Sequence, residues 1–190
     1  MKIRQAGFTL IELMVVVAIV AILASLAAPS FSTLLSRRAA TAAADSLVSD
    51  MTLARSEALK RSAAATVCRS TDGLTCSTVF GSWHVGWLVF IDMNGNGTNL
   101  DAGGVVDAGD TVVRVQQGLS GIATILDDVA ANPKKFVRYD PNGRARGMNQ
   151  TFSVVPSGVA STGATGTTRL VCISVTGRPS LRAVGATACL

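Results

Sequence analysis

The chain is poor in charged and aromatic side chains, and this scarcity narrows the class of protein. Charged residues make up 15% of its 190 residues and aromatic residues 5%, whereas 48% are hydrophobic. An ordinary soluble domain carries about 25% charged residues, so the apolar excess requires either a very large core or a membrane segment. Disorder is excluded, because unfolded chains combine low hydrophobicity with high charge. The length suits a single domain.

Residues suited to catalysis are scarce as well. The single histidine, His84, offers little acid–base chemistry near neutral pH. The sequence contains no nucleophile–base pair and no phosphate-binding loop. His84 also lacks a neighbouring Cys-x-x-Cys pair, so there is no zinc-site pattern. We therefore expect a structural protein without a cofactor, apart from the calcium considered below, and not an enzyme.

The apolar excess is concentrated near the N-terminus. Residues 13–24 carry no polar side chain, and the apolar Phe8, Leu10 and Ile11 precede them. About 20 residues are therefore available to span a hydrocarbon core roughly 30 Å thick. Lys2 and Arg4 precede this stretch and favour a cytoplasmic N-terminus. The rest of the chain would then lie outside the cytoplasm.

A cleavable secretory signal is the alternative interpretation of this stretch, because residues 24–27 offer the small side chains of a cleavage site. Glu12 argues against that alternative, since a carboxylate inside an apolar segment costs about 2.5–3.5 kcal/mol on insertion scales. A buried carboxylate becomes tolerable when a cation pairs with it, and the α-amine of another identical helix is such a cation.

The segment KIRQAGFTLIELMVVVAIVAILASLAAPSF resembles the leader and N-terminal helix of type IV pilins and type II secretion pseudopilins. The resemblance implies that a prepilin peptidase removes residues 1–7 by cutting between Gly7 and Phe8, and that the new Phe8 amine is methylated. It also implies that Glu12 pairs with the Phe8 amine of a neighbouring subunit, and that Pro29 is the proline at which the family's helix bends or melts.

The rest of the chain predicts an α+β fold, a long helix packed on an antiparallel sheet. We expect residues 8–30 to form a transmembrane helix in a bacterial inner membrane and residues 31–190 to form a periplasmic domain. Within that domain the helix would continue over residues 31–63, and residues 64–190 would form a β-domain. Apolar residues recur at helical spacing at Ala44, Leu47, Val48, Met51, Ala54 and Ala58. Charged residues lie mainly off that stripe, with Glu57 and Arg61 forming an i,i+4 pair.

Short β-like runs separated by turn residues follow the helix. We predict strands at 65–69, 85–91, 111–117, 121–126, 135–139, 151–155, 169–175 and 181–184. Trp87 and Phe90 fall on opposite faces of one of them, where a role in the core or on the sheet surface is expected.

Residues 81–97, together with residues 107–110 and Arg114, narrow the resemblance to the GspH/FimT family of minor pilins and type II secretion pseudopilin H. The family implies a structural subunit that enters a type IV pilus or a type II secretion pseudopilus, near its tip or at its initiation. Its partners would be other pilins or pseudopilins, the prepilin peptidase and the inner-membrane assembly platform. Both machines remain open, because the N-terminal helix serves either.

Asp92, Asn94 and Asn96, followed by Gly97, match the start of an EF-hand-like calcium loop. The twelfth position of that loop is Gly103, where a bidentate glutamate is needed, so Asp101, Asp107 and Asp110 would have to supply carboxylates to a differently built calcium site. The alternative is a strand connection that needs these residues only for its turn geometry.

Four cysteines, Cys68, Cys76, Cys172 and Cys189, allow three pairings. Proximity in the sequence favours 68 with 76 and 172 with 189. Disulfides are the default for a domain outside the cytoplasm.

The charge is unevenly divided: residues 67–133 carry a net −5 and residues 134–190 a net +7. Such a basic field attracts polyanions. Some FimT-like minor pilins bind DNA through a C-terminal Gly-Arg-x-Arg motif, so the resemblance makes DNA a candidate partner, through Arg144 and Arg146 or through Arg178 and Arg182. The alternative is that these arginines contact the acidic segment of neighbouring subunits.

Overall fold

The fold is described from a computed structural model of the chain. The structure describes residues 9–77, 79, 81–94, 106–107, 109–127, 136–146, 150–158 and 167–182, and gives the backbone alone for residues 26–30 and 146. The chain divides into two compact units, Met1–Leu35 and Ser36–Leu190.

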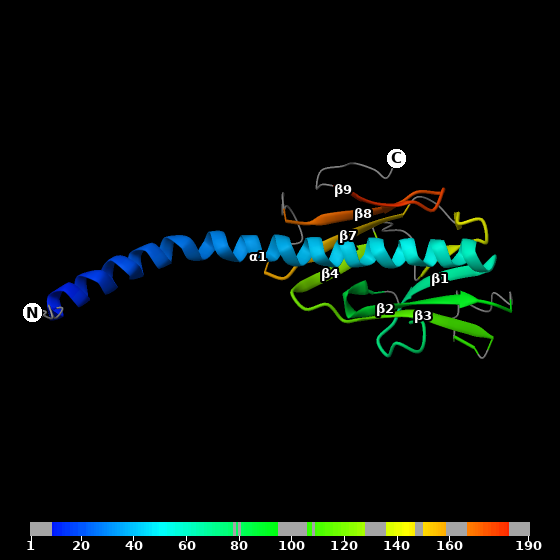
Figure 1. The fold of residues 1–190 in the computed structure, drawn as a ribbon, viewed down its shortest axis with the longest axis horizontal. Helices are drawn as coiled ribbons and strands as arrows, with labels where there is room; N and C mark the ends of the chain where they lie inside the picture. The colour runs from blue at the N-terminus through cyan, green and yellow to red at the C-terminus, as the bar shows by residue number, and fades with distance from the viewer. Residues whose placement is uncertain are drawn as a thin grey trace, which may run out of the picture. The chain divides into compact units, whose positions relative to one another are not determined.

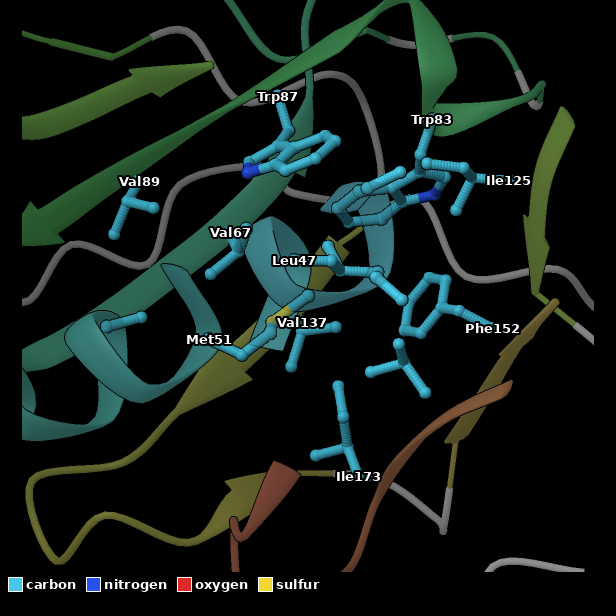
Figure 2. Packing of buried hydrophobic residues seen from close by; sticks show 14 of the residues in the cluster. Leu47, Met51, Val67, Trp83, Trp87, Val89, Ile125, Val137, Phe152 and Ile173 are labelled. Carbon is cyan, nitrogen blue, oxygen red and sulfur yellow. The ribbon is translucent and has the colours of Figure 1, made fainter. Parts of the chain in front are cut away.

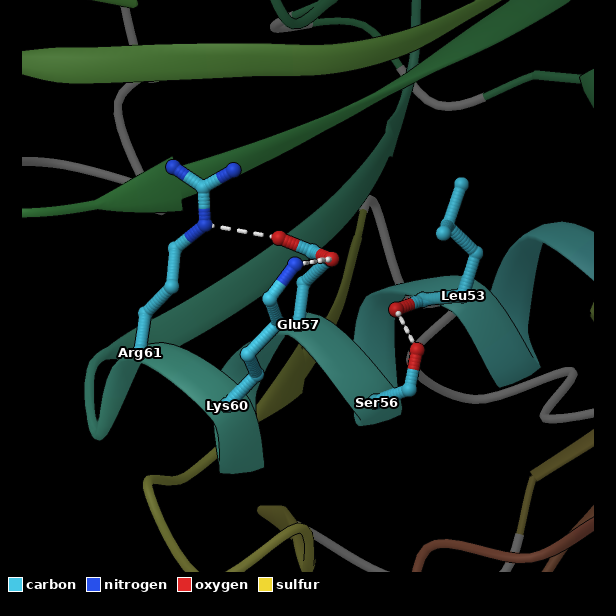
Figure 3. Close-up of polar contacts among 5 residues, drawn as sticks. All are labelled: Leu53, Ser56, Glu57, Lys60 and Arg61. Atoms are coloured by element: carbon cyan, nitrogen blue, oxygen red, sulfur yellow. Dashed lines mark hydrogen bonds and ion pairs between the residues drawn. The ribbon is translucent and has the colours of Figure 1, made fainter.

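The helix α1 spans Leu10–Arg61 and is continuous through Pro29. It ends at Ser62, whose φ of 51° lies in the left-handed region, and the Ala63 N–H donates to the Ala58 carbonyl at 3.3 Å. This is the bond pattern of a Schellman cap. In the last turns, Glu57 accepts from Arg61 Nε at 2.6 Å and also pairs with Lys60 (Figure 3). The predicted Glu57–Arg61 pair is therefore confirmed.

The strands form two antiparallel sheets (Figure 1). The first sheet has the order β3-β2-β1-β5-β6, with β1 at Ala64–Arg69, β2 at Gly86–Asp92, β3 at Asp110–Gln117, β5 at Phe136–Tyr139 and β6 at Ala145–Arg146. The second sheet has the order β4-β7-β8-β9, with β4 at Ile122–Asp127, β7 at Gln150–Pro156, β8 at Arg169–Ile173 and β9 at Pro179–Arg182. The α+β class is confirmed, whereas the division into two sheets was not expected.

The chain changes sheet between β3 and β4. Gly121 supports the tight turn there with a φ of 76°, a value that favours glycine. A short 3₁₀-helix, η1 at Trp83–Val85, then helps to hold the two sheets together. The Ser82 hydroxyl, which caps η1, accepts from the Ile125 N–H of β4 at 2.7 Å, and the Leu119 N–H donates to the His84 carbonyl at 2.8 Å.

One core is shared by α1 and both sheets. The predicted helical stripe is buried, with Ala44, Leu47, Met51, Ala54 and Ala58 fully covered and Val48 partly covered. Figure 2 shows Leu47 and Met51 lying among side chains from both sheets. The Trp83 and Phe152 rings meet edge to face, with centroids 5.1 Å apart. The residues Ser36–Arg61 of α1 therefore act as the central element of the second unit.

The first sheet also buries its opposite face. Trp87, Val89 and Ile91 of β2 belong to the main core, while Leu88 and Phe90 form a second cluster with Cys68 and Cys76. The predicted opposite facing of Trp87 and Phe90, and their core role, are confirmed. A strand buried on both faces loses the polar alternation of a half-exposed strand, which is why β2 reads as a continuous apolar run.

Candidate assembly segment and charged sites

The described side chains at the N-terminal end of α1 are exposed. Its large apolar residues between Leu10 and Leu23 are each at least 52% exposed. A contiguous exposed apolar surface of this kind marks an interaction site. Gly7 and Phe8 lie outside the described residues. In the part of the chain that is described, no helix has a stretch long and apolar enough to cross a membrane.

Glu12 has a local role at the start of α1. Its Oε2 accepts from the Thr9 N–H and from the Thr9 hydroxyl, both at 3.0 Å, and the Glu12 N–H donates to Thr9 Oγ1 at 3.3 Å. This reciprocal arrangement is a capping box, which satisfies N–H groups that a helix start leaves without partners. The Thr-x-x-Glu spacing before an apolar run is the sequence signal for this capping box, which was not predicted.

A buried polar contact connects α1 to the first sheet. Asp50 Oδ2 accepts from Trp87 Nε1 at 2.9 Å, and Asp50 Oδ1 lies 3.4 Å from Arg114 Nε on β3. Burial raises the pKa of Asp50, while the hydrogen bond from Trp87 and the charge of Arg114 oppose the rise. The helical pattern places the charged residues of this segment off the buried stripe, but Asp50 is buried.

The calcium candidates that the structure describes are engaged with one another and with an arginine. Asp92 Oδ2 pairs with Arg138 at 2.8 Å, and Asn94 donates to Asp107 Oδ1 at 3.1 Å. Asp107 Oδ1 also accepts from the Gly109 N–H at 2.8 Å, which is turn chemistry. Asn96 and Asp101 lie outside the described residues. Within the described ranges, no group of acidic, histidine or cysteine residues is arranged to hold a metal ion.

An open hollow of about 410 Å³ in the second unit is lined by arginines. We call it the arginine hollow, and its lining residues are Arg37, Arg38, Thr41, Ala42, Asp45 and Arg169. Arg169 Nε of β8 donates to Thr41 Oγ1 of α1 at 3.2 Å, and Thr41 Oγ1 donates to the Arg37 carbonyl at 2.9 Å. Two elements far apart in the sequence thus place guanidinium groups around one concave surface.

The two glycine–arginine turns of the basic C-terminal third meet in space. A side chain at Gly177, which has a φ of 79°, would collide with the Gly143 carbonyl, and this same carbonyl accepts from Arg55 Nε at 2.9 Å. Arg144 and Arg178, which follow these two glycines, are exposed, as is Arg182 at the end of β9. Arg146 lies in β6. The two turns are separate candidates in the sequence, whereas the fold brings them together.

Cys68 and Cys76 are joined by a disulfide, with their Cα atoms 5.5 Å apart. Asp72 organises the enclosed loop: its carboxylate accepts from the Thr75 hydroxyl at 2.7 Å and from the Leu74 and Thr75 N–H groups at 2.9 and 2.8 Å. These bonds hold the pKa of Asp72 well below its usual range. Cys172 is disulfide-bonded as well, and Cys189 lies outside the described residues.

Comparison with known proteins points to one family. The family model for type II transport protein GspH matches residues 43–177, and the prokaryotic N-terminal methylation motif matches residues 2–28. No curated protein sequence matches the chain significantly.

The chain is similar to solved structures of a minor pilin and of a minor pseudopilin. The type IV minor pilin FimU of Pseudomonas aeruginosa is 20% identical and superposes with a TM-score of 0.53, covering 81% of this chain and 97% of its own. A second crystal form of FimU gives a TM-score of 0.51 at 21% identity, covering 79% of this chain and 99% of its own. The minor pseudopilin EpsH of Vibrio cholerae gives 0.48 at 12% identity, covering 78% and 99%.

Proposed function

Because the chain belongs to the GspH family of type II transport proteins, we propose that it is a minor pilin or pseudopilin, a structural subunit and not an enzyme. It would enter a type IV pilus or a type II secretion pseudopilus, together with other pilins or pseudopilins. The observation that carries the proposal is the exposed apolar start of α1 with one carboxylate in it, Glu12, inside a match to the N-terminal methylation motif.

The proposal includes maturation and membrane anchoring. A prepilin peptidase would cut between Gly7 and Phe8, and methylation would follow at Phe8. Residues 13–36 contain no charged side chain. As a helix these 24 residues extend about 36 Å at 1.5 Å per residue, against a hydrocarbon core of about 30 Å. The chain would therefore wait in the inner membrane, with the second unit in the periplasm, until the assembly platform moves it into a filament.

Glu12 supplies the assembly contact in this proposal. A carboxylate in an apolar environment requires a cation, and cleavage before Phe8 creates an α-amine on each subunit that can pair with the Glu12 of a neighbour. The capping box with Thr9 is the competing explanation for a carboxylate at this position, because it stabilises the helix start within one chain.

Two single substitutions separate the two roles of Glu12. Glu12→Gln keeps an N3 side chain that completes a capping box but removes the charge. Thr9→Ala removes the capping hydroxyl and keeps the charge. We expect Glu12→Gln to insert into the membrane normally and to be lost from filaments, because removing one partner of a buried ion pair costs about 3–5 kcal/mol. Thr9→Ala should enter filaments.

The measurement is the amount of each variant in sheared filaments relative to the amount in the membrane fraction. Normal incorporation of Glu12→Gln together with loss of Thr9→Ala would make the carboxylate a helix cap and would reject the pairing. The two machines are then distinguished by deleting the gene, since loss of surface pili identifies a type IV pilus and loss of protein secretion identifies a pseudopilus.

A second candidate function is DNA contact in uptake, and it is proposed from the exposed Arg144, Arg178 and Arg182 of the basic C-terminal third. Arg178→Ala with Arg182→Ala should weaken DNA binding by the full chain in detergent and flatten its salt dependence, because each lost phosphate contact lowers the salt slope by about one. A gel-shift titration at several salt concentrations makes this measurement. Absence of binding by the wild-type chain at low salt would remove this candidate.

A further inference from the structure

The arginine hollow has no role in the fold that accounts for its charge. Among the residues that the structure describes, Arg37, Arg38 and Arg169 form no ion pair, and neither does Asp45, the one carboxylate among the lining residues. The lining therefore carries three positive charges against one negative charge. Like charges gathered without compensation repel one another and favour an anionic ligand.

The chemistry of the hollow suits a phosphate group. A guanidinium presents its donors in a planar fork that matches phosphate oxygens, and the hollow collects three of them around a concave surface. Arg169 is held in place by its hydrogen bond to Thr41, at 3.2 Å. This bond holds the Arg169 guanidinium at the hollow before a ligand arrives.

The position of the hollow along α1 indicates where that phosphate comes from. Arg37 and Arg38 are the first charged residues after the 24 uncharged residues 13–36. A bilayer is about 30 Å thick in its hydrocarbon core and about 40–45 Å with its headgroups. With Glu12 at the inner edge of the hydrocarbon core, a helix whose uncharged part is about 36 Å long places the next two side chains at the level of the lipid phosphates on the other side.

We propose that the arginine hollow binds the phosphate of an anionic phospholipid, and that this contact holds the unit Ser36–Leu190 on the membrane surface before the subunit enters a filament. This inference rests on the proposed function, because it requires α1 to be anchored in a bilayer. Arg37 and Arg38 bind from the helix and Arg169 from the sheet, so one lipid headgroup connects the membrane to both parts of the domain.

The test uses the full chain reconstituted in phosphatidylcholine vesicles, with and without phosphatidylglycerol, and then extracted in mild detergent. Native mass spectrometry counts the lipids that remain bound. The wild type should retain phosphatidylglycerol in preference to phosphatidylcholine. Each arginine near an anionic surface changes binding about fivefold, so the triple variant Arg37→Gln, Arg38→Gln, Arg169→Gln should lose that preference on the order of a hundredfold.

A charge-matched control variant carries Arg144→Gln, Arg178→Gln and Arg182→Gln, which remove the same charge from exposed turns and from the end of β9. It should retain phosphatidylglycerol as the wild type does. Arg37→Gln with Arg38→Gln leaves the Arg169–Thr41 bond intact, and should show about a twenty-fivefold loss with unchanged unfolding of the domain.

Three results would overturn the inference. The first is equal loss of lipid in the control variant, which would make the attraction non-specific. The second is displacement of the lipid by millimolar inorganic phosphate, which would make the hollow a site for free anions. The third is normal lipid retention with failed filament entry in the triple variant, which would assign the hollow to a carboxylate of a neighbouring subunit. If the wild type does not insert even into phosphatidylcholine vesicles, the anchored helix of the proposed function fails instead.

Discussion

The Asp50 carboxylate links the helix to two strands at once, because it accepts from Trp87 on β2 and faces Arg114 on β3. Replacing Asp50 with alanine leaves the buried indole N–H without an acceptor, which costs about 1–3 kcal/mol. We expect Asp50→Ala to lower the free energy of unfolding by about 2 kcal/mol. Arg114→Ala should cost less than about 1 kcal/mol, because the Arg114 side chain is 55% exposed. Urea denaturation of both variants tests this order, and a larger loss for Arg114→Ala would contradict it.

Asp50 also affects how stability depends on pH. Its pKa is raised in the folded state by burial, so the folded protein holds the proton more tightly than the unfolded chain. Asp50 contributes its full stabilisation when the pH is below 3.8, its pKa in the unfolded chain. This contribution is lost as the pH rises through the higher pKa of Asp50 in the folded protein. Asp72 acts in the opposite direction, because its lowered pKa adds stability above the unfolded value and loses it on acidification.

Neutral variants separate these two opposing contributions. Asp50→Asn should make stability rise more steeply with pH in the range just above 4 than it does in the wild type. Below the unfolded pKa of 3.8, Asp72→Asn should flatten the rise, because it removes a carboxylate whose ionised form is hydrogen-bonded in the folded state. Thermal unfolding monitored on both sides of pH 4 measures the two slopes. Parallel curves for Asp50→Asn and the wild type would show that Asp50 does not titrate differently on folding.

Sequence patterns predicted some residues of these sites and missed others for physical reasons. The Glu57–Arg61 pair follows from helical spacing, and its two atoms lie 2.6 Å apart. Asp50 was missed because periodicity assigns charged residues to solvent, while its burial depends on an indole N–H brought from another element. The arginine hollow was also missed, because Arg169 reaches Thr41 across 128 residues of sequence.

At the scale of elements, the disulfide loop covers the outer face of the first sheet. Cys68 and Cys76 are buried with Leu88 and Phe90, and a side chain added at Gly73 would press on Val115 of β3. Replacing both cysteines with alanine removes the loop constraint on the unfolded chain. We expect the free energy of unfolding to fall by about 2–3 kcal/mol.

The measurement is urea denaturation of the Cys68→Ala, Cys76→Ala variant beside the wild type. Phe90→Ala is a comparison variant, because it removes a side chain of the same cluster and leaves the bridge in place. If the cysteine variant is as stable as the wild type, then the loop is held by the Asp72 hydrogen bonds alone.

Most of the elements could be predicted from the sequence, but not their arrangement in two sheets. The predicted strands correspond to β1–β5 and β7–β9, with boundaries shifted by a few residues, because apolar runs and turn residues mark them locally. β6 was missed because it has only two residues. The change of sheet between β3 and β4 depends on which strands pair, and that is decided by contacts distant in the sequence.

At the scale of the whole molecule, α1 buries one part of the helix and exposes another. Leu47 is fully buried between the sheets, whereas Leu23 is 60% exposed. Leu47→Ala should therefore lower the free energy of unfolding by about 2–5 kcal/mol, and Leu23→Ala should leave it unchanged. Both tryptophans, Trp83 and Trp87, are buried in the core of the second unit, so tryptophan fluorescence during urea denaturation reports on this unit.

In filament assembly the effects of the two variants should be reversed: at matched protein amounts, Leu23→Ala should be impaired and Leu47→Ala should not. Leu23→Ala removes packing contacts from the exposed segment, and helices that associate from a bilayer depend on such van der Waals packing, because lipid is itself as apolar as leucine. Its incorporation into filaments should fall, while the Leu47→Ala protein that remains folded should enter filaments normally. Equal incorporation of Leu23→Ala and the wild type would mean that the exposed segment is not packed against neighbouring subunits. If the expected order holds, substitutions in the N-terminal segment affect assembly and substitutions in the globular domain affect stability, independently of one another. This independence is what we expect if neighbouring subunits cover the exposed end of the helix.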